Sequence, residues 1–272
     1  MKTRKWSPQY SLLTERNIGI VSRSQQEKLR NSCVAVLGLG GLGGVVAEVL
    51  TRCGIGKLKL VDRHIFEPTN LNRQMFAFVN TVKRKKVEVI AEFLKKINPE
   101  IRLEKYFRIN ALNADKIMNE CDVIVLALDG IKECVLMSRI ANEKCVPLIE
   151  GWALPYGNVR VISRKTQSLE QLYKLPTIHK NIRRFSESSY RKMRQMMVQK
   201  VVMEMRGAQK YYDPKATKRM KKGQLAFRSF CPMVRLTADM MALETIKVIL
   251  GWGKIAYAPR FAVYDPFQLK TL

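Results

Sequence analysis

The sequence is poor in the residues that most often bind transition metals or carry acid–base catalysis. Its 272 residues include only 2 histidines and 6 cysteines, and no two cysteines are spaced as CxxC. A structural zinc site built from paired CxxC motifs is therefore excluded, and histidine-based catalysis has little material. We expect His64 and His179 to lie at the surface. The cysteines sit mostly in apolar runs and are expected to be reduced thiols of the core.

Long hydrophobic runs are also missing. No stretch approaches the length of a membrane span, and the amino-terminal MKTRKWSPQY has no apolar segment of the kind found in signal peptides. With 47% hydrophobic and 26% charged residues, the composition is that of a soluble globular protein, in one large or two small domains. We expect a cytoplasmic protein that does not enter a membrane.

Acidic residues are scarce relative to basic ones, and the imbalance is local. The net charge is +26, and residues 164–230 hold 18 Lys and Arg against 4 Asp and Glu. Such a segment attracts polyanions or acidic proteins, but a solvated basic face explains it equally well. Within this segment a helix is expected whose apolar face repeats every three or four residues, at Tyr190, Met193, Met197, Val201, Met205 and Ala208. We favour packing of this face on the core over a peptide- or membrane-binding role. Residues 211–224 are expected to form a mobile loop.

The stretch from Val34 to Lys86 carries the strongest pattern. A short apolar strand, 34–37, leads directly into Gly38, Gly40, Gly41 and Gly43. A helical apolar pattern follows, and then a second strand, 58–61, ends at Asp62. Glycines let the backbone approach a phosphate, and the helix amino terminus offers its N–H groups to that anion. A carboxylate at Asp62 suits the hydroxyls of a ribose, so the pattern predicts a nucleotide site.

The residues after Asp62 favour a triphosphate over a dinucleotide. Asn70, Arg73 and Gln74 lie in the run NLNRQ, and Lys86 opens an amphipathic helix that ends near Ile97. A cation in the first turn of a helix is unfavourable beside the helix dipole, and a bound phosphate would relieve that cost. Two cations placed in this way can neutralise phosphate oxygens as charge moves during nucleotidyl transfer.

The rest of the chain predicts an α/β fold with a doubly wound, mostly parallel sheet. Further strands are expected at 101–108, 123–128, 146–150, 158–163 and 261–264, and further helices at 113–120, 132–144 and 233–250. Asp129 follows the 123–128 strand, where ligands bind in such sheets, and could hold Mg²⁺ against phosphates. The alternative is that Asp129 only caps the next helix. We expect an N-terminal helical arm (1–33), a nucleotide-binding half (34–163), a basic helical insertion (164–230) and a C-terminal helix and strand that complete the same domain and extend its sheet (231–272).

These motifs together resemble the ThiF/MoeB/HesA family, bacterial relatives of ubiquitin-activating enzymes. The similarity rests on GLGGLG, Asp62, NLNRQ, Lys86-Val87-Glu88, the strand before Asp129 and PLIEG at 147–151, and it covers about 10–163 and 231–272. Many members hold zinc with two CxxC pairs, which this chain lacks. The resemblance implies a homodimer that binds ATP and Mg²⁺ through Gly38, Gly40, Gly41, Gly43, Asp62, Asn70, Arg73, Gln74, Lys86 and Asp129.

The same resemblance implies catalytic roles for Arg73, Lys86 and Asp129. It also suggests that Arg16 reaches the ATP site of the partner subunit, and it leaves open whether Cys231 forms a thioester or is a buried structural thiol. The implied reaction is adenylation of a carboxylate, either on a small ubiquitin-like carrier protein or on a ribosomally made precursor peptide. Two alternatives stay open: a nucleic-acid-binding protein on a retired enzyme fold, suggested by the charge, and an NAD-dependent oxidoreductase that shares the glycine turn.

Overall fold

A single mixed β-sheet organises the protein. The computed structural model describes residues 6–204, 208–221, 224–225 and 228–271, and these form eight strands in the order β3-β2-β1-β4-β5-β6-β7-β8. The first five run parallel to one another, and each of the last three pairs antiparallel with the strand before it. The predicted doubly wound sheet with a C-terminal extension is therefore confirmed. The strands are β1 (Cys33–Leu37), β2 (Lys57–Val61), β3 (Arg102–Tyr106), β4 (Val123–Leu126), β5 (Leu148–Glu150), β6 (Gly157–Ile162), β7 (Ala262–Asp265) and β8 (Lys270–Thr271).

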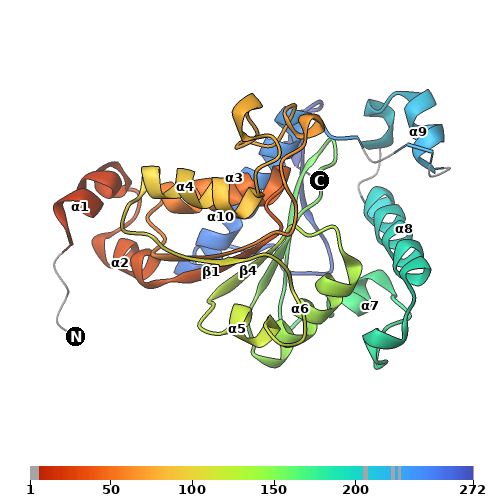
Figure 1. Ribbon diagram of the computed structural model, residues 1–272, viewed down its shortest axis with the longest axis horizontal. Helices are drawn as coiled ribbons and strands as arrows, with labels where there is room; N and C mark the ends of the chain where they lie inside the picture. The colour runs from red at the N-terminus through yellow and green to blue at the C-terminus, as the bar shows by residue number, and fades with distance from the viewer. Residues whose placement is uncertain (1–5, 205–207, 222–223, 226–227, 272) are drawn as a thin grey trace.

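Helices cover both faces of this sheet (Figure 1). One face carries α3 (Gly41–Arg52), α4 (Lys86–Ile97) and α10 (Cys231–Leu250), and the other carries α5 (Ala114–Met118), α6 (Ile131–Glu143) and α7 (Leu169–Tyr173). Short 3₁₀ turns occur at Pro68–Asn70, Val79–Thr81, Ile182–Arg184 and Ala208–Tyr211. No helix among the described residues is long and apolar enough to cross a membrane.

The apolar strands are explained by burial on both sides. In β1, Val34 and Val36 belong to the core beneath α3, α4 and α10, whereas Ala35 and Leu37 belong to the core beneath α5, α6 and α7. All four are fully buried. A strand between two helical layers has no solvent face, so its sequence shows a continuous apolar run rather than alternation.

The N-terminal arm forms α1 (Pro8–Thr14), a 3₁₀ turn (Glu15–Asn17) and α2 (Arg23–Asn31). The hydroxyl of Tyr10 donates to the carbonyl of Gly54, 2.7 Å away, just after α3 ends. The arm therefore lies at the amino-terminal edge of the parallel strands. Figure 1 places it at the opposite end of the molecule from the basic segment.

The basic segment contains the expected long helix, α8 (Glu187–Glu204). Tyr190, Met193, Met197 and Val201 are buried and belong to the core that also contains α6 and α7. The interpretation of this face as a packed one is thus confirmed for these four residues. Met205 lies outside the described residues, and Ala208 begins the 3₁₀ turn that follows.

Two of the structural predictions from the sequence are wrong. The expected loop at 211–224 contains a helix, α9 (Pro214–Lys221). The start of this helix could have been predicted from the sequence, because Asp followed by Pro is typical of a helix start. In the structure the carboxylate of Asp213 accepts from the backbone N–H groups of Lys215 and Ala216, and Pro214 occupies the first turn. Cys145 is exposed rather than part of the core, although all six cysteines are free thiols as expected. Both histidines are exposed, as predicted.

Candidate functional site

The glycine turn joins β1 to α3 at the carboxyl edge of the parallel strands. Its positions require glycine for different physical reasons. Gly38 has φ +90°, and a Cβ there would lie 2.2 Å from the carbonyl oxygen of Ala127. A Cβ on Gly43 would lie 1.8 Å from the carbonyl oxygen of Gly38. Gly40 instead faces open space, with only the Gln74 amide nitrogen near, at 3.8 Å. No side chain caps the first turn of α3, so its N–H groups can meet an anion beside Gly40.

Asp62 connects the end of β2 to the glycine turn. Its side chain is almost fully buried; one carboxylate oxygen accepts from the Leu39 N–H at 2.8 Å, and the other accepts from the His64 N–H at 2.7 Å. The imidazole Nδ1 of His64 lies 3.2 Å from the same carboxylate. Each carboxylate oxygen has two lone pairs, so a ribose hydroxyl can still donate to it.

Lys86 is the first residue of α4 and is only 7% exposed. Burial lowers the pKa of its ammonium group, Asp62 and Asp129 act to raise that pKa, and the Arg73 cation lowers it further. The structure thus brings the two predicted cations and the two predicted carboxylates within electrostatic range of one another. A partly desolvated ammonium group between them interacts strongly with an added anion.

Residues 70–74 lie beside the glycine turn and are held by local hydrogen bonds. Asn70 is buried and accepts from the Glu67 N–H at 3.1 Å. One nitrogen of the Arg73 guanidinium group donates to the carbonyl of Thr69 and to the side chain of Asn72, at 2.9 and 2.8 Å. Gln74 is buried behind Gly40, and its Oε1 has no hydrogen-bond partner among the described residues. A ligand at Gly40 is one way to satisfy that oxygen.

Asp129 lies three residues beyond the end of β4, and its partner was not foreseen. The helix-cap alternative fails, because Gly130 occupies the cap position of α6 and no side chain caps that helix. Instead a carboxylate oxygen of Asp129 pairs with the guanidinium group of Arg194 on α8, at 2.8 Å. Both side chains are largely exposed, 80% for Asp129 and 49% for Arg194. An ion pair this exposed contributes little stability and exchanges readily.

Arg16 and Cys231 lie at different distances from this cluster. Arg16 is exposed in the N-terminal arm at the amino-terminal edge of the strands, so it does not belong to the cluster of its own chain. Cys231 begins α10 and is half-buried. One turn later, Val234 would lie 2.7 Å from a Cβ on Gly41. The start of α10 therefore lies beside the glycine turn.

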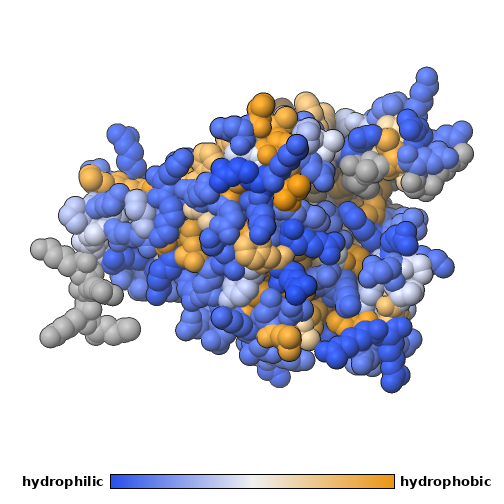
Figure 2. Space-filling view, in the orientation of Figure 1, coloured by the Kyte–Doolittle hydropathy of each residue, from blue (hydrophilic) through white to orange (hydrophobic). Residues whose placement is uncertain are grey.

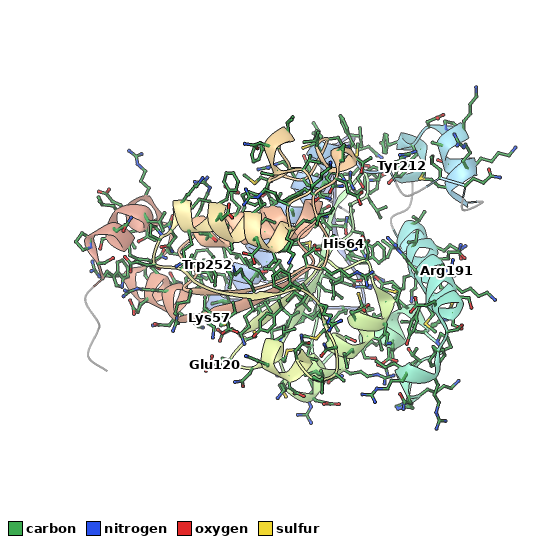
Figure 3. All side chains as sticks on the ribbon, in the orientation of Figure 1. Lys57, His64, Glu120, Arg191, Tyr212 and Trp252 are labelled. Atoms are coloured by element: carbon green, nitrogen blue, oxygen red, sulfur yellow. The ribbon has the colours of Figure 1, made fainter. Side chains whose placement is uncertain are left out.

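A cavity of about 610 Å³ adjoins the cluster. It lies between the carboxyl ends of β4 and β5 on one side and α8 and α9 on the other, and Asp129 and Leu42 form its border with the glycine turn. Hydrophobic side chains, orange in Figure 2, are visible between the sheet and the part of the surface formed by α8 and α9. Arg191 on α8 and Tyr212 before α9, both labelled in Figure 3, line this cavity.

The inner end of the cavity is a hydrogen-bonded polar network that sequence reasoning did not find. Glu150 accepts from Arg160 at 2.7 Å, from Tyr173 at 2.5 Å and from the indole of Trp152 at 3.1 Å. Arg160 is completely buried and also donates to the carbonyl of Pro259. A buried charge is tolerated only when paired in this way. The network holds the cavity wall formed at β5 and β6 in place. No local pattern in the sequence predicts it.

The side chains of the site fit Mg²⁺ held against phosphates rather than a metal held by protein alone. No group of three or more His, Cys, Asp or Glu side chains gathers to hold a metal in the described part of the chain. Mg²⁺ usually takes one or two carboxylates and completes its shell with water and phosphate oxygens. Asp129 can supply one such carboxylate.

The sheet and the glycine turn at its carboxyl edge define a doubly wound, Rossmann-like α/β protein. The sequence profile of the ThiF family matches residues 14–271. The chain belongs to the ThiF family, as its motifs predicted.

Two curated relatives illustrate the similarity. The chain is 36% identical over 155 residues to ubiquitin-like modifier-activating enzyme 5 of Bombyx mori, covering 54% of this chain and 38% of that protein. It is 35% identical over 145 residues to tRNA threonylcarbamoyladenosine dehydratase of Bacillus subtilis, covering 50% and 54%. The matches thus span about a third to a half of these relatives' own length.

Solved structures share the fold over nearly the whole chain. PaaA superposes with a TM-score of 0.69 and 17% identity, covering 100% of this chain and 75% of PaaA. Escherichia coli MccB, solved together with MccA, gives a TM-score of 0.68 and 21% identity, covering 98% and 72%. At these identities the likeness supports the fold, including the part of the chain that departs from the family motifs.

Proposed function

We propose that the protein adenylates a carboxylate with ATP and releases pyrophosphate. The observation that carries the proposal is the cluster of Lys86, Arg73, Asp62 and Asp129 around an uncapped helix terminus. Membership in a family with a relative named as a ubiquitin-like modifier-activating enzyme supports it. The fold neighbour MccB has been solved with ATP and with MccA.

Each residue has a role that follows from its position. Asp62 accepts from the ribose hydroxyls, and the N–H groups beside Gly40 and Gly41 bind phosphate oxygens. Asn70 and Gln74 hold the segment that carries Arg73 against the glycine turn. Arg73 and Lys86 neutralise charge on the α-phosphate and on the leaving pyrophosphate. Mg²⁺, held by Asp129, supplies further charge neutralisation on the phosphates when bound.

The reaction needs little acid–base chemistry, which suits a site without a buried histidine. One oxygen of the substrate carboxylate forms a bond to the α-phosphorus, and the bond from that phosphorus to the oxygen bridging to the β-phosphate breaks. The bridging oxygen keeps the electron pair and leaves with pyrophosphate. No proton moves, so the residues of the cluster act by positioning and by electrostatics.

The substrate is either a small ubiquitin-like carrier protein or a ribosomally made precursor peptide. A homodimer completes the site if Arg16 enters it from the partner subunit. Cys231 begins the helix that packs beside the glycine turn, so it is a candidate to receive an acyl group in a later step, although its half-buried place also suits a structural thiol. Nucleic acid is a less favoured partner, since the cluster explains nucleotide binding without it.

Calorimetric titration separates this proposal from the oxidoreductase alternative. MgATP should bind the wild-type protein, and NAD⁺ should bind weakly or not at all. Arg73→Ala should weaken MgATP binding, because the guanidinium group faces the phosphates. Tight NAD⁺ binding that survives Arg73→Ala would contradict the proposal.

A further inference from the structure

The cavity between the sheet and α8–α9 differs chemically from the nucleotide cluster that it adjoins. Leu128 and Leu154 line it from the segments that follow β4 and β5, and Val198, Val202 and Met220 line it from α8 and α9. Its volume, about 610 Å³, is in the range of small-molecule sites. A lining of this kind binds an apolar group, and a glycine residue would leave most of it empty.

Charged groups gather at the border between the cavity and the nucleotide cluster. Asp129 belongs to both, and Arg194 holds it across the gap at 2.8 Å. Arg191 lies one turn earlier on α8 and lines the same cavity. A planar guanidinium group matches a carboxylate in two parallel hydrogen bonds. Because the pair with Asp129 is exposed and weak, an incoming carboxylate can replace it.

Building on the adenylation proposed above, we propose that this cavity binds the carboxyl-terminal residue of a peptide whose last side chain is large and apolar. Arg194 binds the terminal carboxylate, and the apolar walls bind the side chain. The carboxylate then lies beside Asp129, next to the α-phosphate bound by Lys86 and Arg73. The substrate is therefore a peptide ending in a residue such as leucine, rather than a carrier protein that ends in two glycines.

The lysine between the two arginines provides a matched control. Lys192 is exposed on α8 and does not line the cavity, whereas Arg191 and Arg194 do. Its removal changes the charge of α8 by the same amount as the removal of Arg194. If the basic segment attracts peptides only through its general charge, both substitutions should weaken peptide binding equally. If Arg194 binds the terminal carboxylate, only the substitution of Arg194 should weaken it.

Calorimetric titration of hexapeptides tests the proposal, with a non-hydrolysable MgATP analogue present. The peptides share four residues and end in Ala-Leu, in Gly-Gly or in Ala-Leu carboxamide. The Ala-Leu peptide should bind at least about tenfold more tightly than the Gly-Gly peptide, because its side chain buries four carbons. The carboxamide should bind about 10- to 100-fold more weakly, and Arg194→Gln should weaken the acid by a similar factor. Lys192→Gln should change neither affinity.

Filling the cavity provides the structural arm of the test. Val198→Trp should abolish peptide binding while the affinity for the MgATP analogue stays at the wild-type value. If that variant does not fold, Met220→Trp fills the cavity from α9 instead of α8. Equal binding of the Gly-Gly and Ala-Leu peptides, or normal peptide binding by a folded, cavity-filled variant, would overturn the inference.

The same titrations distinguish this inference from the proposed function. If no hexapeptide binds while the MgATP analogue does, the cavity assignment is wrong and adenylation still stands. If the Ala-Leu peptide binds as expected but the MgATP analogue does not bind, adenylation is wrong and the cavity is a peptide site of another kind.

Discussion

At the scale of single residues, we expect Lys86 to set the pH dependence of nucleotide binding. Burial lowers its pKa below the usual 10.5, so the free protein loses this charge at a lower pH than an exposed lysine would. A bound triphosphate favours the charged form and raises the pKa again, so ATP binding takes up a proton in that pH range. ATP affinity should therefore fall as the pH rises through the lowered pKa.

The measurement is the ATP affinity of the wild type and of Lys86→Arg between pH 7 and 10.5. The arginine variant keeps its charge throughout, so its affinity should stay level where that of the wild type falls. The pH dependence of folding stability has the opposite sign to that of ATP affinity. Since the pKa is lower in the folded state, the contribution of Lys86 to stability is largest above 10.5 and is lost as the pH falls through the lowered pKa. Identical pH profiles for wild type and variant would show that Lys86 does not face the phosphates.

Asp62 can be tested separately from the cations. Asp62→Asn keeps the shape of the side chain but removes the charge and one acceptor, so ATP affinity should fall about tenfold or more. The carboxylate also holds Leu39 and His64, so thermal unfolding must be compared in parallel. A variant with the wild-type melting temperature and unchanged ATP affinity would contradict the ribose-binding role.

The candidate site residues could largely be predicted from the sequence, but contacts between residues that lie far apart in the sequence could not. Asp62 and Arg73 stand in a local pattern that follows a strand, and the resemblance to the family selects Lys86 from among the cations of its turn. Arg194 lies 65 residues from Asp129, and nothing in the run around it distinguishes it from Arg191 or Lys192. Likewise, Glu150 and Arg160 come together because β5 and β6 pair antiparallel, a register that the sequence does not specify.

At the scale of elements, the glycine turn separates packing from binding. Gly43→Ala should destabilise the protein by about 1–3 kcal/mol, because its Cβ would meet backbone that cannot move away. Gly40→Ala has room for its Cβ and should leave the free energy of unfolding nearly unchanged, but that methyl group faces the phosphate site. Chemical denaturation and ATP titration of the two variants should therefore give opposite patterns. Loss of ATP affinity only in Gly43→Ala would refute this division of roles.

The helices of the basic segment show the limit of reading elements from composition. The apolar repeat of α8 was clear enough to predict its buried face. In α9, basic residues dominate the composition and suggest a loop, yet Asp213 and Pro214 start a helix that lines the cavity through Thr217 and Met220. Local capping signals carried more information than charge density in this segment.

At the scale of the whole molecule, the proposed homodimer predicts complementation. If Arg16 acts in the site of the partner subunit, Arg16→Ala and Arg73→Ala proteins should each lose most of their activity alone. Mixed and allowed to exchange subunits, they form dimers with one intact site, so about a quarter of the wild-type sites should return. The readout is pyrophosphate exchange after mixing. Full activity of Arg16→Ala alone would show that the partner's arginine is not needed.

The proposed reaction cleaves the nucleotide between its α- and β-phosphates to activate a carboxylate. The most direct measurement is product analysis after incubation with MgATP and a peptide that ends in leucine, together with exchange of labelled pyrophosphate into ATP. We expect peptide-dependent formation of a peptidyl-adenylate and pyrophosphate, and exchange that falls roughly a hundredfold in Arg73→Ala and Lys86→Ala, the scale for loss of one preorganised charge contact. Formation of ADP and phosphate, or exchange that both variants sustain at the wild-type rate, would contradict the account.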